Sequence, residues 1–188
     1  RQYKDKGVNV TSEVTVHHLT LTDEACATYN PATRVSPPLR SWDHVQAMRE
    51  AVLDGTVDAI VTDHAPHAPE EKDVECRYAP CGFCGMETSL GVMLTDLYHT
   101  NIFDLKPIIS KMSCEPSKLF KLERGTLAEG AVADITIMDL NKEWTVDSSK
   151  FYTRGKFTPY EGKECKGKAV ATMLAGKFVM RDGVVCAK

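Results

Sequence analysis

Hydrophobic positions in the first part of the chain change repeatedly between the two-residue period of strands and the spacing of helices. Residues 9–16 are rich in β-branched side chains and alternate in polarity, which predicts a strand that passes into a loop. Residues 57–62 form a nearly continuous apolar run, which predicts a strand buried on both faces. Between these strands, residues 41–55 place apolar residues at helical spacing. This order predicts β/α alternation.

The helix between these two strands has a recognisable start and end. Ser41 is a residue type that caps helix N-termini, and Gly55 is placed to stop the helix. Val45, Met48 and Val52 recur at helical spacing and predict the buried face. The helix then leads directly into the second strand, as in a β/α unit.

Further helical patterns follow the second strand. Residues 86–100 repeat the helical spacing, and residues 104–112 and 115–122 predict two short helices, each with Pro near its first turn. This part of the chain therefore continues the β/α alternation.

After residue 123 the pattern changes to short β-rich runs separated by Gly-containing turns. One such turn is Ala175-Gly176-Lys177. Runs and turns of this kind predict a small antiparallel sheet. We therefore expect an α/β chain with strand–helix units in residues 1–122 and a β module in residues 123–188.

The composition is that of a globular protein and gives no sign of a nucleic-acid or membrane partner. Hydrophobic residues make up 43% and charged residues 26% of the 188 residues, near the average for globular domains. The net charge of −3 and the lack of a basic stripe argue against nucleic-acid binding. No apolar stretch approaches the ~20 residues of a membrane span. We expect the partners to be small molecules.

An acid and two histidines directly follow the predicted strand 57–62. In a parallel β/α array, ligands bind at the carboxyl ends of the strands, which is where Asp63 lies. Its carboxylate is suited to be a zinc ligand or a proton acceptor, and His64 and His67 in the following loop are near enough to share the site. The alternative is that Asp63 caps the loop by accepting hydrogen bonds from nearby N–H groups.

The seven cysteines are odd in number and are not spaced as a disulfide framework, which indicates a reducing compartment, the cytoplasm. Cys76, Cys81 and Cys84 form a C-x4-C-x2-C pattern. One interpretation is a thiolate zinc site, which needs about four ligands, so that His64 or His67 would have to complete it. The other interpretation is three free thiols in a loop.

Five segments occur in order along residues 10–188: EVTVHHL, SPPLRS, TDHAPH, APCGFCGMET and GTLAEGAVADITIMD. Their order and spacing closely resemble those of the dihydroorotases of the amidohydrolase superfamily, specifically the bacterial type with a long C-terminal β module. The resemblance implies a distorted (β/α)8 TIM-type barrel with a binuclear metal centre, usually zinc, and a composite β-sandwich. It also implies the reversible interconversion of dihydroorotate and N-carbamoyl-L-aspartate in pyrimidine biosynthesis.

The resemblance implies a role for each matching residue. Asp63 resembles the last metal ligand of the barrel, which takes the proton of the attacking metal-bridging hydroxide and delivers it to the leaving amide nitrogen. His67 resembles the histidine that binds the substrate carboxylate, and the backbone of Cys81 and Gly82 corresponds to a substrate-contacting pair. Ser36 stands where the family often has Asn or Arg in contact with substrate, and its shorter hydroxyl reaches less far.

The histidine pair of EVTVHHL is not a metal ligand by this resemblance. In the family, the corresponding histidines follow the ligand-bearing segment. We expect His17 and His18 to be a hydrogen-bonded pair at a strand end.

The resemblance also implies metal ligands that this chain does not contain. An H-x-H motif, a bridging Asp or carboxylated Lys, and two further histidines precede, in the family, the position of Arg1. We therefore expect the chain to be the C-terminal part of a barrel, to bind little zinc by itself and to be inactive in isolation. Because a partial barrel exposes strand edges and an apolar face, we expect it to pair with the missing N-terminal half or a second copy.

Two alternatives stay open at this point. One is a non-catalytic dihydroorotase-like subunit that supports aspartate transcarbamoylase. The other is a related amidohydrolase such as allantoinase or dihydropyrimidinase, which the joint presence of TDHAPH and SPPLRS disfavours. The presence of both Asp63 and His67 favours an enzyme, since a scaffold needs neither.

Overall fold

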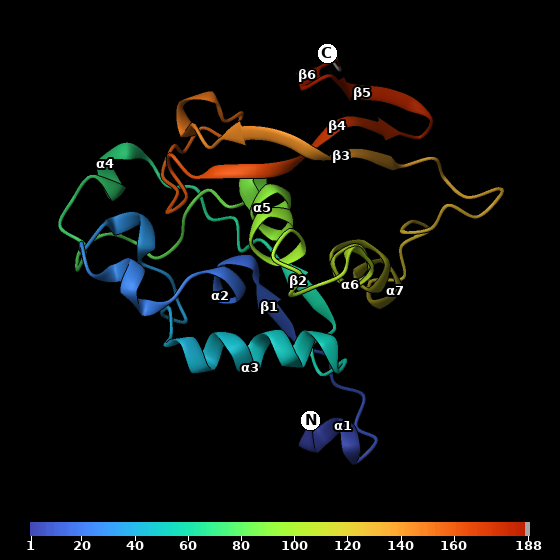
Figure 1. The fold of residues 1–188 in the computed structure, drawn as a ribbon, viewed down its shortest axis with the longest axis horizontal. Coiled ribbons are helices and arrows are strands. Elements are labelled where there is room, and N and C mark those ends of the chain that lie inside the picture. Colours follow the sequence, from blue (N-terminus) through green and yellow to red (C-terminus); the bar gives the residue numbers. More distant parts are fainter. Residues whose placement is uncertain (187–188) are drawn as a thin grey trace.

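Two short parallel strands, β1 (Glu13–Thr15) and β2 (Ala59–Val61), lie near the centre of the structure, a computed structural model that describes residues 1–186 (Figure 1). The connection between them contains α3 (Trp42–Leu53), which covers one side of the pair. Helix α5 (Met86–Met93) lies on the other side, beneath the C-terminal sheet. The strands are shorter than the sequence predicts, but their order and direction follow the expected β/α alternation.

Short helices complete this part of the chain. Two π-helical segments extend longer helices: Leu94–Tyr98 continues α5, and Ser110–Cys114 joins α6 to α7. Three 3-10 helices occur in the loops, at Asp23–Cys26, Pro31–Thr33 and Ser148–Lys150. The remaining helices are α1 (Gln2–Asp5), α2 (Val16–Thr20), α4 (Pro69–Lys72), α6 (Leu105–Ile109) and α7 (Glu115–Leu119).

The C-terminal part of the chain forms a four-stranded antiparallel sheet in the order β3-β4-β5-β6. Ala175 and Gly176, which join β4 to β5, have φ values of 47° and 78°, as a tight hairpin turn requires. The predicted antiparallel sheet is thereby confirmed. Its strands are β3 (Ile135–Thr145), β4 (Glu164–Leu174), β5 (Lys177–Arg181) and β6 (Val184–Val185).

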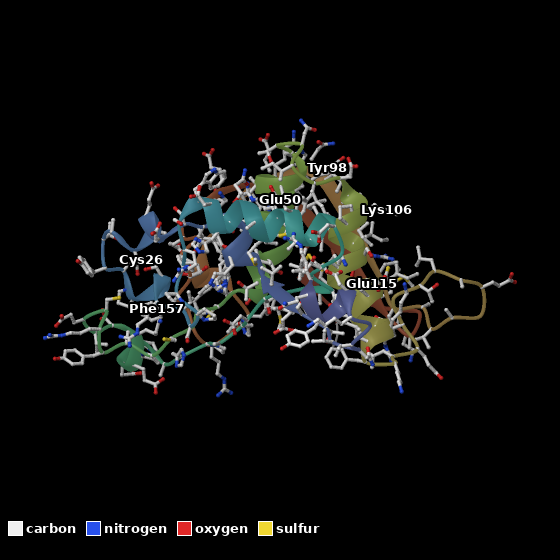
Figure 2. All side chains as sticks on the ribbon, turned by 90° about the horizontal axis from the view of Figure 1, so that it is seen from below. Cys26, Glu50, Tyr98, Lys106, Glu115 and Phe157 are labelled. Atoms are coloured by element: carbon white, nitrogen blue, oxygen red, sulfur yellow. The ribbon has the colours of Figure 1, made fainter. Side chains whose placement is uncertain are left out.

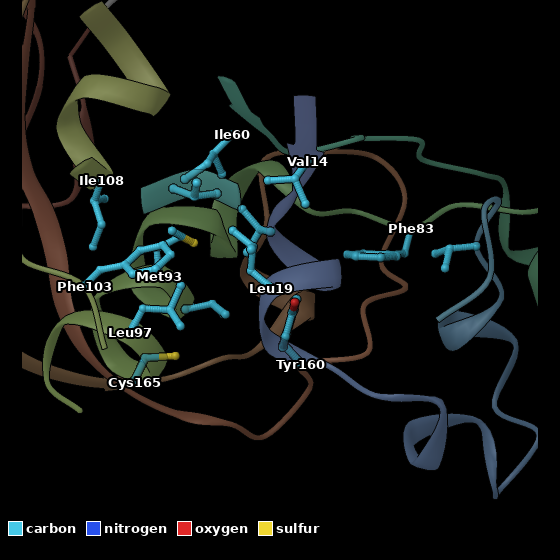
Figure 3. Close-up of a cluster of buried hydrophobic side chains, with 14 of the residues drawn as sticks. Val14, Leu19, Ile60, Phe83, Met93, Leu97, Phe103, Ile108, Tyr160 and Cys165 are labelled. Carbon is cyan, nitrogen blue, oxygen red and sulfur yellow. The ribbon is translucent and has the colours of Figure 1, made fainter. Parts of the chain in front are cut away.

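One apolar core joins the parallel strands to the C-terminal sheet through α5 and its π-helical extension (Figure 3). Met93 and Leu97 are fully buried between Ile60 of β2 and Cys165 of β4. The contact between the α5 extension and the sheet is so close that a Cβ at Gly167 would lie 2.6 Å from the Leu94 side chain. The C-terminal sheet is therefore packed directly onto α5 and its π-helical extension.

The structure corrects the expected strand over residues 9–16. Only three of these residues are in β1, and the chain turns into helix α2 at Val16. The physical reason is a helix cap: the Thr15 hydroxyl accepts a hydrogen bond from the His18 N–H at 3.2 Å. The expected strand-to-loop passage is thus helical from Val16 to Thr20.

The buried face of α3 also differs from the expected one. Met48 is exposed, and Arg49 is buried in its place. The guanidinium of Arg49 donates to the Leu19 carbonyl at 2.9 Å and lies over the Trp42 ring. Leu19 lies in α2, a helix that the sequence did not predict. The burial of Arg49 therefore could not be predicted either.

The expected pair of short helices is continuous in the structure. α6 passes through a π-helical segment directly into α7, so residues 105–119 form one irregular helical rod. The helical prediction is confirmed there, and the expected break is wrong.

Parts of the described structure are open at their edges. β1 and β2 each pair on one side only within residues 1–186. No helix in the described residues is long and apolar enough to cross a membrane. Several large apolar side chains of the C-terminal sheet are exposed, namely Ile137, Leu174, Phe178, Val184 and Val185.

We predict that Gly167→Ala destabilises the chain more than Gly130→Ala. Both glycines have positive φ, which costs an alanine about 1–2 kcal/mol, but only Gly167 faces a packed neighbour, which adds about 1–3 kcal/mol. Chemical denaturation should therefore give a loss of about 2–5 kcal/mol for Gly167→Ala and about 1–2 kcal/mol for Gly130→Ala. Equal losses in the two variants would contradict the close packing of the sheet against Leu94.

Candidate functional site

Asp63 lies two residues beyond the end of β2, is exposed and has a φ of 49°. Since β1 and β2 are parallel, their carboxyl ends lie at the same edge. The carboxylates of Asp54 and Asp134 accept hydrogen bonds from backbone N–H groups, whereas Asp63 accepts none from residues 1–186. The alternative of a loop cap is therefore not realised, and the Asp63 carboxylate is available at the strand end.

The residues after Asp63 pair with a second loop segment. His64 forms a parallel bridge with Phe83, and the Ala65 N–H donates to the Phe83 carbonyl at 3.0 Å. The His64 Nδ1 accepts a hydrogen bond from the Met86 N–H at the start of α5, at 3.2 Å. This pairing brings the loop containing Cys81 and Gly82 beside the end of β2.

His67 lies between a carboxylate and a backbone carbonyl. Its Nε2 is 3.0 Å from the Cys81 carbonyl oxygen, so Nε2 donates there, and its Nδ1 is 3.6 Å from a Glu71 carboxylate oxygen. Its side chain is 23% exposed. His67 thus lies against the Cys81 backbone while its side chain stays partly exposed.

Gly82 occupies a position that only glycine fits. Its φ is 113°, and a Cβ there would lie 2.5 Å from the Ala65 Cβ and 3.5 Å from the His67 Nε2. The Gly82 N–H donates to the Arg34 carbonyl at 2.8 Å. The structure thus brings His67, Cys81 and Gly82 together.

Ser36 is exposed and lies in the loop that precedes α3. Arg34, two residues before it, accepts the hydrogen bond from Gly82, and the Pro37 carbonyl lies 3.2 Å from the His18 Nε2. These contacts place the Ser36 loop next to the Gly82 loop, and the Ser36 side chain makes no hydrogen bond within residues 1–186.

A buried lysine ties the same loops together. Lys72, at the end of α4, is fully buried, and its ammonium donates to the carbonyls of Pro31, Pro80 and Gly82 at 2.8, 2.9 and 2.7 Å. Sequence reasoning missed Lys72, because the Glu70-Glu71-Lys72 triplet has the composition of a solvated turn. The one available signal was its position five residues after His67.

A segment of the C-terminal part, residues 151–157, covers the loop from the other side. The Glu87 carboxylate accepts hydrogen bonds from the N–H groups of Tyr152 and Thr153 at 2.9 and 3.0 Å. The Phe157 carbonyl accepts the Cys84 N–H at 2.8 Å. Figure 2 shows Phe157 and Cys26 at one end of the molecule, with the loop that follows β2, and Lys106 and Glu115 towards the other end.

The histidine pair departs from the expectation. His18 is hydrogen-bonded as expected, with its Nδ1 2.6 Å from the Thr15 hydroxyl oxygen. His17 is 1% exposed, and neither of its ring nitrogens has a hydrogen-bond partner among residues 1–186. Burial, and secondarily the neighbouring His18, lowers the pKa of His17 to about 3, so the ring is neutral. It packs edge-on against Phe83 of the site loop, at 5.1 Å between ring centroids.

The described residues do not complete a zinc site. Within residues 1–186, no three His, Cys, Asp or Glu side chains converge in a group that could hold a metal ion. Cys81 is exposed and Cys84 is buried, and all seven cysteines are free thiols. Asp63 offers one oxygen ligand, whereas Zn²⁺ takes about four ligands. This chain alone therefore does not fit the implied binuclear zinc centre.

These observations define an α/β protein with an acid at the carboxyl end of a parallel strand and two loops held beside it. A model of the Amidohydrolase family matches residues 5–179, and the chain belongs to this family. It is 47% identical over 182 residues to the dihydroorotase of Syntrophus aciditrophicus (strain SB), covering 97% of this chain and 42% of that protein. It is 45% identical over 183 residues to the dihydroorotase of Listeria innocua serovar 6a, covering 97% and 43%.

Solved structures share the fold. The L-hydantoinase (dihydropyrimidinase) from Arthrobacter aurescens matches with a TM-score of 0.93 at 32% identity, over 98% of this chain and 42% of that one. The dihydropyrimidinase from Brevibacillus agri NCHU1002 matches with a TM-score of 0.90 at 23% identity, over 98% and 42%, a likeness of fold alone. These matches confirm the predicted fold class, the C-terminal part of a (β/α)8-type barrel followed by part of a β-sandwich. The chain spans less than half the length of these relatives.

We predict that this chain alone holds little zinc after dialysis. One carboxylate and a nearby histidine give weak binding, since about four ligands are needed. Elemental analysis should find zinc far below one equivalent. Stoichiometric zinc that is lost in Cys81→Ser or Cys84→Ser would contradict this account and establish a cysteine site.

Proposed function

We propose that the chain is the C-terminal part of a dihydroorotase, a cyclic amide hydrolase that interconverts dihydroorotate and N-carbamoyl-L-aspartate in pyrimidine biosynthesis. The observation that carries the proposal is the loop pair at the end of β2, where Asp63 accepts no hydrogen bond from residues 1–186 and His67 contacts the backbone at Cys81. The 44–48% identity to proteins named dihydroorotase supports the choice of substrate.

Asp63 acts in this proposal as the general base. Its carboxylate takes the proton from the water that attacks the ring carbonyl and returns a proton to the amide nitrogen that leaves. An exposed carboxylate at a strand end, without a donor among the described residues, keeps its lone pairs for this exchange. Asp63 is also the residue of this chain that would serve as a metal ligand, while the other ligands would have to come from outside this chain.

Substrate binding falls to His67 and the backbone of the neighbouring loop. His67 binds the substrate carboxylate through a ring N–H, and the Glu71 carboxylate lies 3.6 Å from its Nδ1. Cys81 and Gly82 contact the substrate through their backbone, to which the absence of a side chain at Gly82 gives close access. Ser36 stays a candidate for a weaker contact, in the loop beside Gly82.

The whole protein requires partners that this chain lacks. We propose that the missing N-terminal part of the same protein pairs with the open edges of β1 and β2, and that the assembled protein is a homo-oligomer in the cytoplasm. The seven free thiols support a reducing compartment. Association with aspartate transcarbamoylase is the expected partner interaction of the non-catalytic alternative.

Assays of the complete protein decide among these functions. We expect hydrolysis of dihydroorotate, with activity on dihydrouracil, hydantoin and allantoin at least 100-fold lower in kcat/KM. Preference for dihydrouracil or hydantoin would instead favour the hydantoinase-type function of the structural neighbours. No turnover of any of these compounds by the metal-loaded complete protein would favour the non-catalytic subunit.

Asp63→Asn in the complete protein should lower kcat in both directions. The amide keeps the size of the side chain and an oxygen atom but accepts no proton, and general-base catalysis contributes typically ~10²–10⁴-fold. KM should change less. The control is Asp73→Asn, which alters an exposed acid after α4. Near-parental turnover by Asp63→Asn with unchanged metal content would exclude Asp63 as the base.

His67→Ala in the complete protein should act mainly on KM. A hydrogen bond to a charged group is worth about 1.5–3 kcal/mol, so kcat/KM should fall roughly 10–150-fold. Steady-state kinetics measure this change, with His44→Ala on the exposed surface of α3 as the matched control. An unchanged KM for N-carbamoyl-aspartate would show that the substrate carboxylate binds elsewhere.

A further inference from the structure

Lys72 uses its whole hydrogen-bonding capacity on backbone carbonyls. An ammonium has three N–H donors, and those of Lys72 reach Pro31, Pro80 and Gly82 at 2.8, 2.9 and 2.7 Å. Its side chain is 0% exposed, which is unusual for lysine without a charged partner. Within residues 1–186 Lys72 forms no ion pair with a carboxylate, and burial lowers its pKa, so the three carbonyls are its hydrogen-bonding partners.

The three acceptors belong to the two loops beside the strand end. Pro31 begins the 3-10 turn that leads to Ser36, and Pro80 and Gly82 flank Cys81. The short helix α4 that carries Lys72 follows residues 62–68, the loop at the strand end. One side chain therefore connects α4 to two loops through carbonyls that are 8 to 41 residues away from it in sequence.

The successive carbonyls of residues 80–82 point to different partners. The carbonyls of Pro80 and Gly82 face Lys72, while that of Cys81, between them, faces the Nε2 of His67. The bend at Cys81 and the φ of 113° at Gly82 set these different directions. Because Lys72 holds the carbonyls of Pro80 and Gly82, the Cys81 carbonyl between them stays directed towards His67.

We propose that Lys72 is a positioning residue for substrate binding, which fixes the Cys81-Gly82 backbone against His67 through its hydrogen bonds to Pro80 and Gly82. This inference rests on the proposed function, which places substrate at that backbone. Lys72 itself does not touch the substrate. Its removal should therefore change binding much more than the chemical step.

The test is Lys72→Met in the complete protein, which keeps the apolar stem and removes the three donors. We expect KM for dihydroorotate to rise at least tenfold while kcat stays within threefold. Lys72→Gln keeps two donors on a shorter side chain and should give an intermediate KM. Lys111→Met is the matched control, because Lys111 also donates to a backbone carbonyl, that of buried Val57 at 2.7 Å, but ahead of β2, at the end opposite the site. It should leave KM within twofold.

A thiol readout tests the same inference without activity. Cys84 is buried beneath the loop, whereas Cys81 is exposed. In Lys72→Met, an alkylating reagent followed by peptide mapping should label Cys84 at least tenfold faster than in the parent, and Lys111→Met should not change this rate. If the complete protein has no dihydroorotase activity, the proposed function fails, and the Cys84 rate still decides whether Lys72 holds the loop.

Three results would overturn the inference. The first is an unchanged KM in Lys72→Met, and the second is an unchanged Cys84 labelling rate. The third is loss of folding in both Lys72 variants, since the residue would then be a general requirement of the fold and not a positioning device of this loop. A fall in kcat with KM unchanged would likewise assign Lys72 to a role other than substrate binding.

Discussion

The arrangement of the site depends on the short pairing between residues 64–65 and Phe83. This pairing holds residues 64–65, which follow Asp63, alongside the segment that contains Phe83. It leaves no room for a side chain at Gly82, where a Cβ would lie 2.5 Å from the Ala65 Cβ. Once these two segments are in contact, His67 reaches the Cys81 carbonyl and Lys72 reaches the carbonyls on either side of it. Asp63 directly precedes the loop of residues 64–67 in sequence. The pairing thereby also brings the loop with Cys81 and Gly82 to the strand end at Asp63.

The C-terminal sheet takes part in this arrangement and is not an appended module. Its 151–157 segment donates to Glu87 and accepts from Cys84, and a Cβ at Gly155 would lie 3.0 Å from the Cys84 sulfur. Tyr160 packs against Phe83 and lies 2.9 Å, hydroxyl to hydroxyl, from Thr20 of α2. The burial that holds the sheet on α5 therefore also limits the movement of the site loop.

Features that depend on local pattern could be predicted from the sequence. The apolar run that ends in Asp63, the helix ended near Gly55 and the hairpin at Ala175-Gly176 each follow from residue type and spacing. The helix at Val16 could not be predicted from alternation, because one hydroxyl cap at Thr15 overrides the β-branched pattern.

The unpredicted parts of the site depend on distant partners. A buried lysine is stable only where several carbonyls converge, and those of Lys72 come from positions up to 41 residues away. Arg49 takes the place expected for Met48 because α2 supplies its acceptor. His17 is neutral and without a hydrogen-bond partner among residues 1–186, which no spacing rule would indicate. By contrast, His67, Cys81 and Gly82 are proposed as site residues from the resemblance of whole segments.

The most direct measurement is a crystal structure of the complete protein with N-carbamoyl-L-aspartate bound. The account predicts that the ligand lies between the Asp63 carboxylate and the Cys81-Gly82 backbone, with its carboxylate at His67 and the hydrogen bonds of Lys72 intact. A ligand bound in the same protein away from the end of β2, with Asp63 and Gly82 out of contact, would contradict the account.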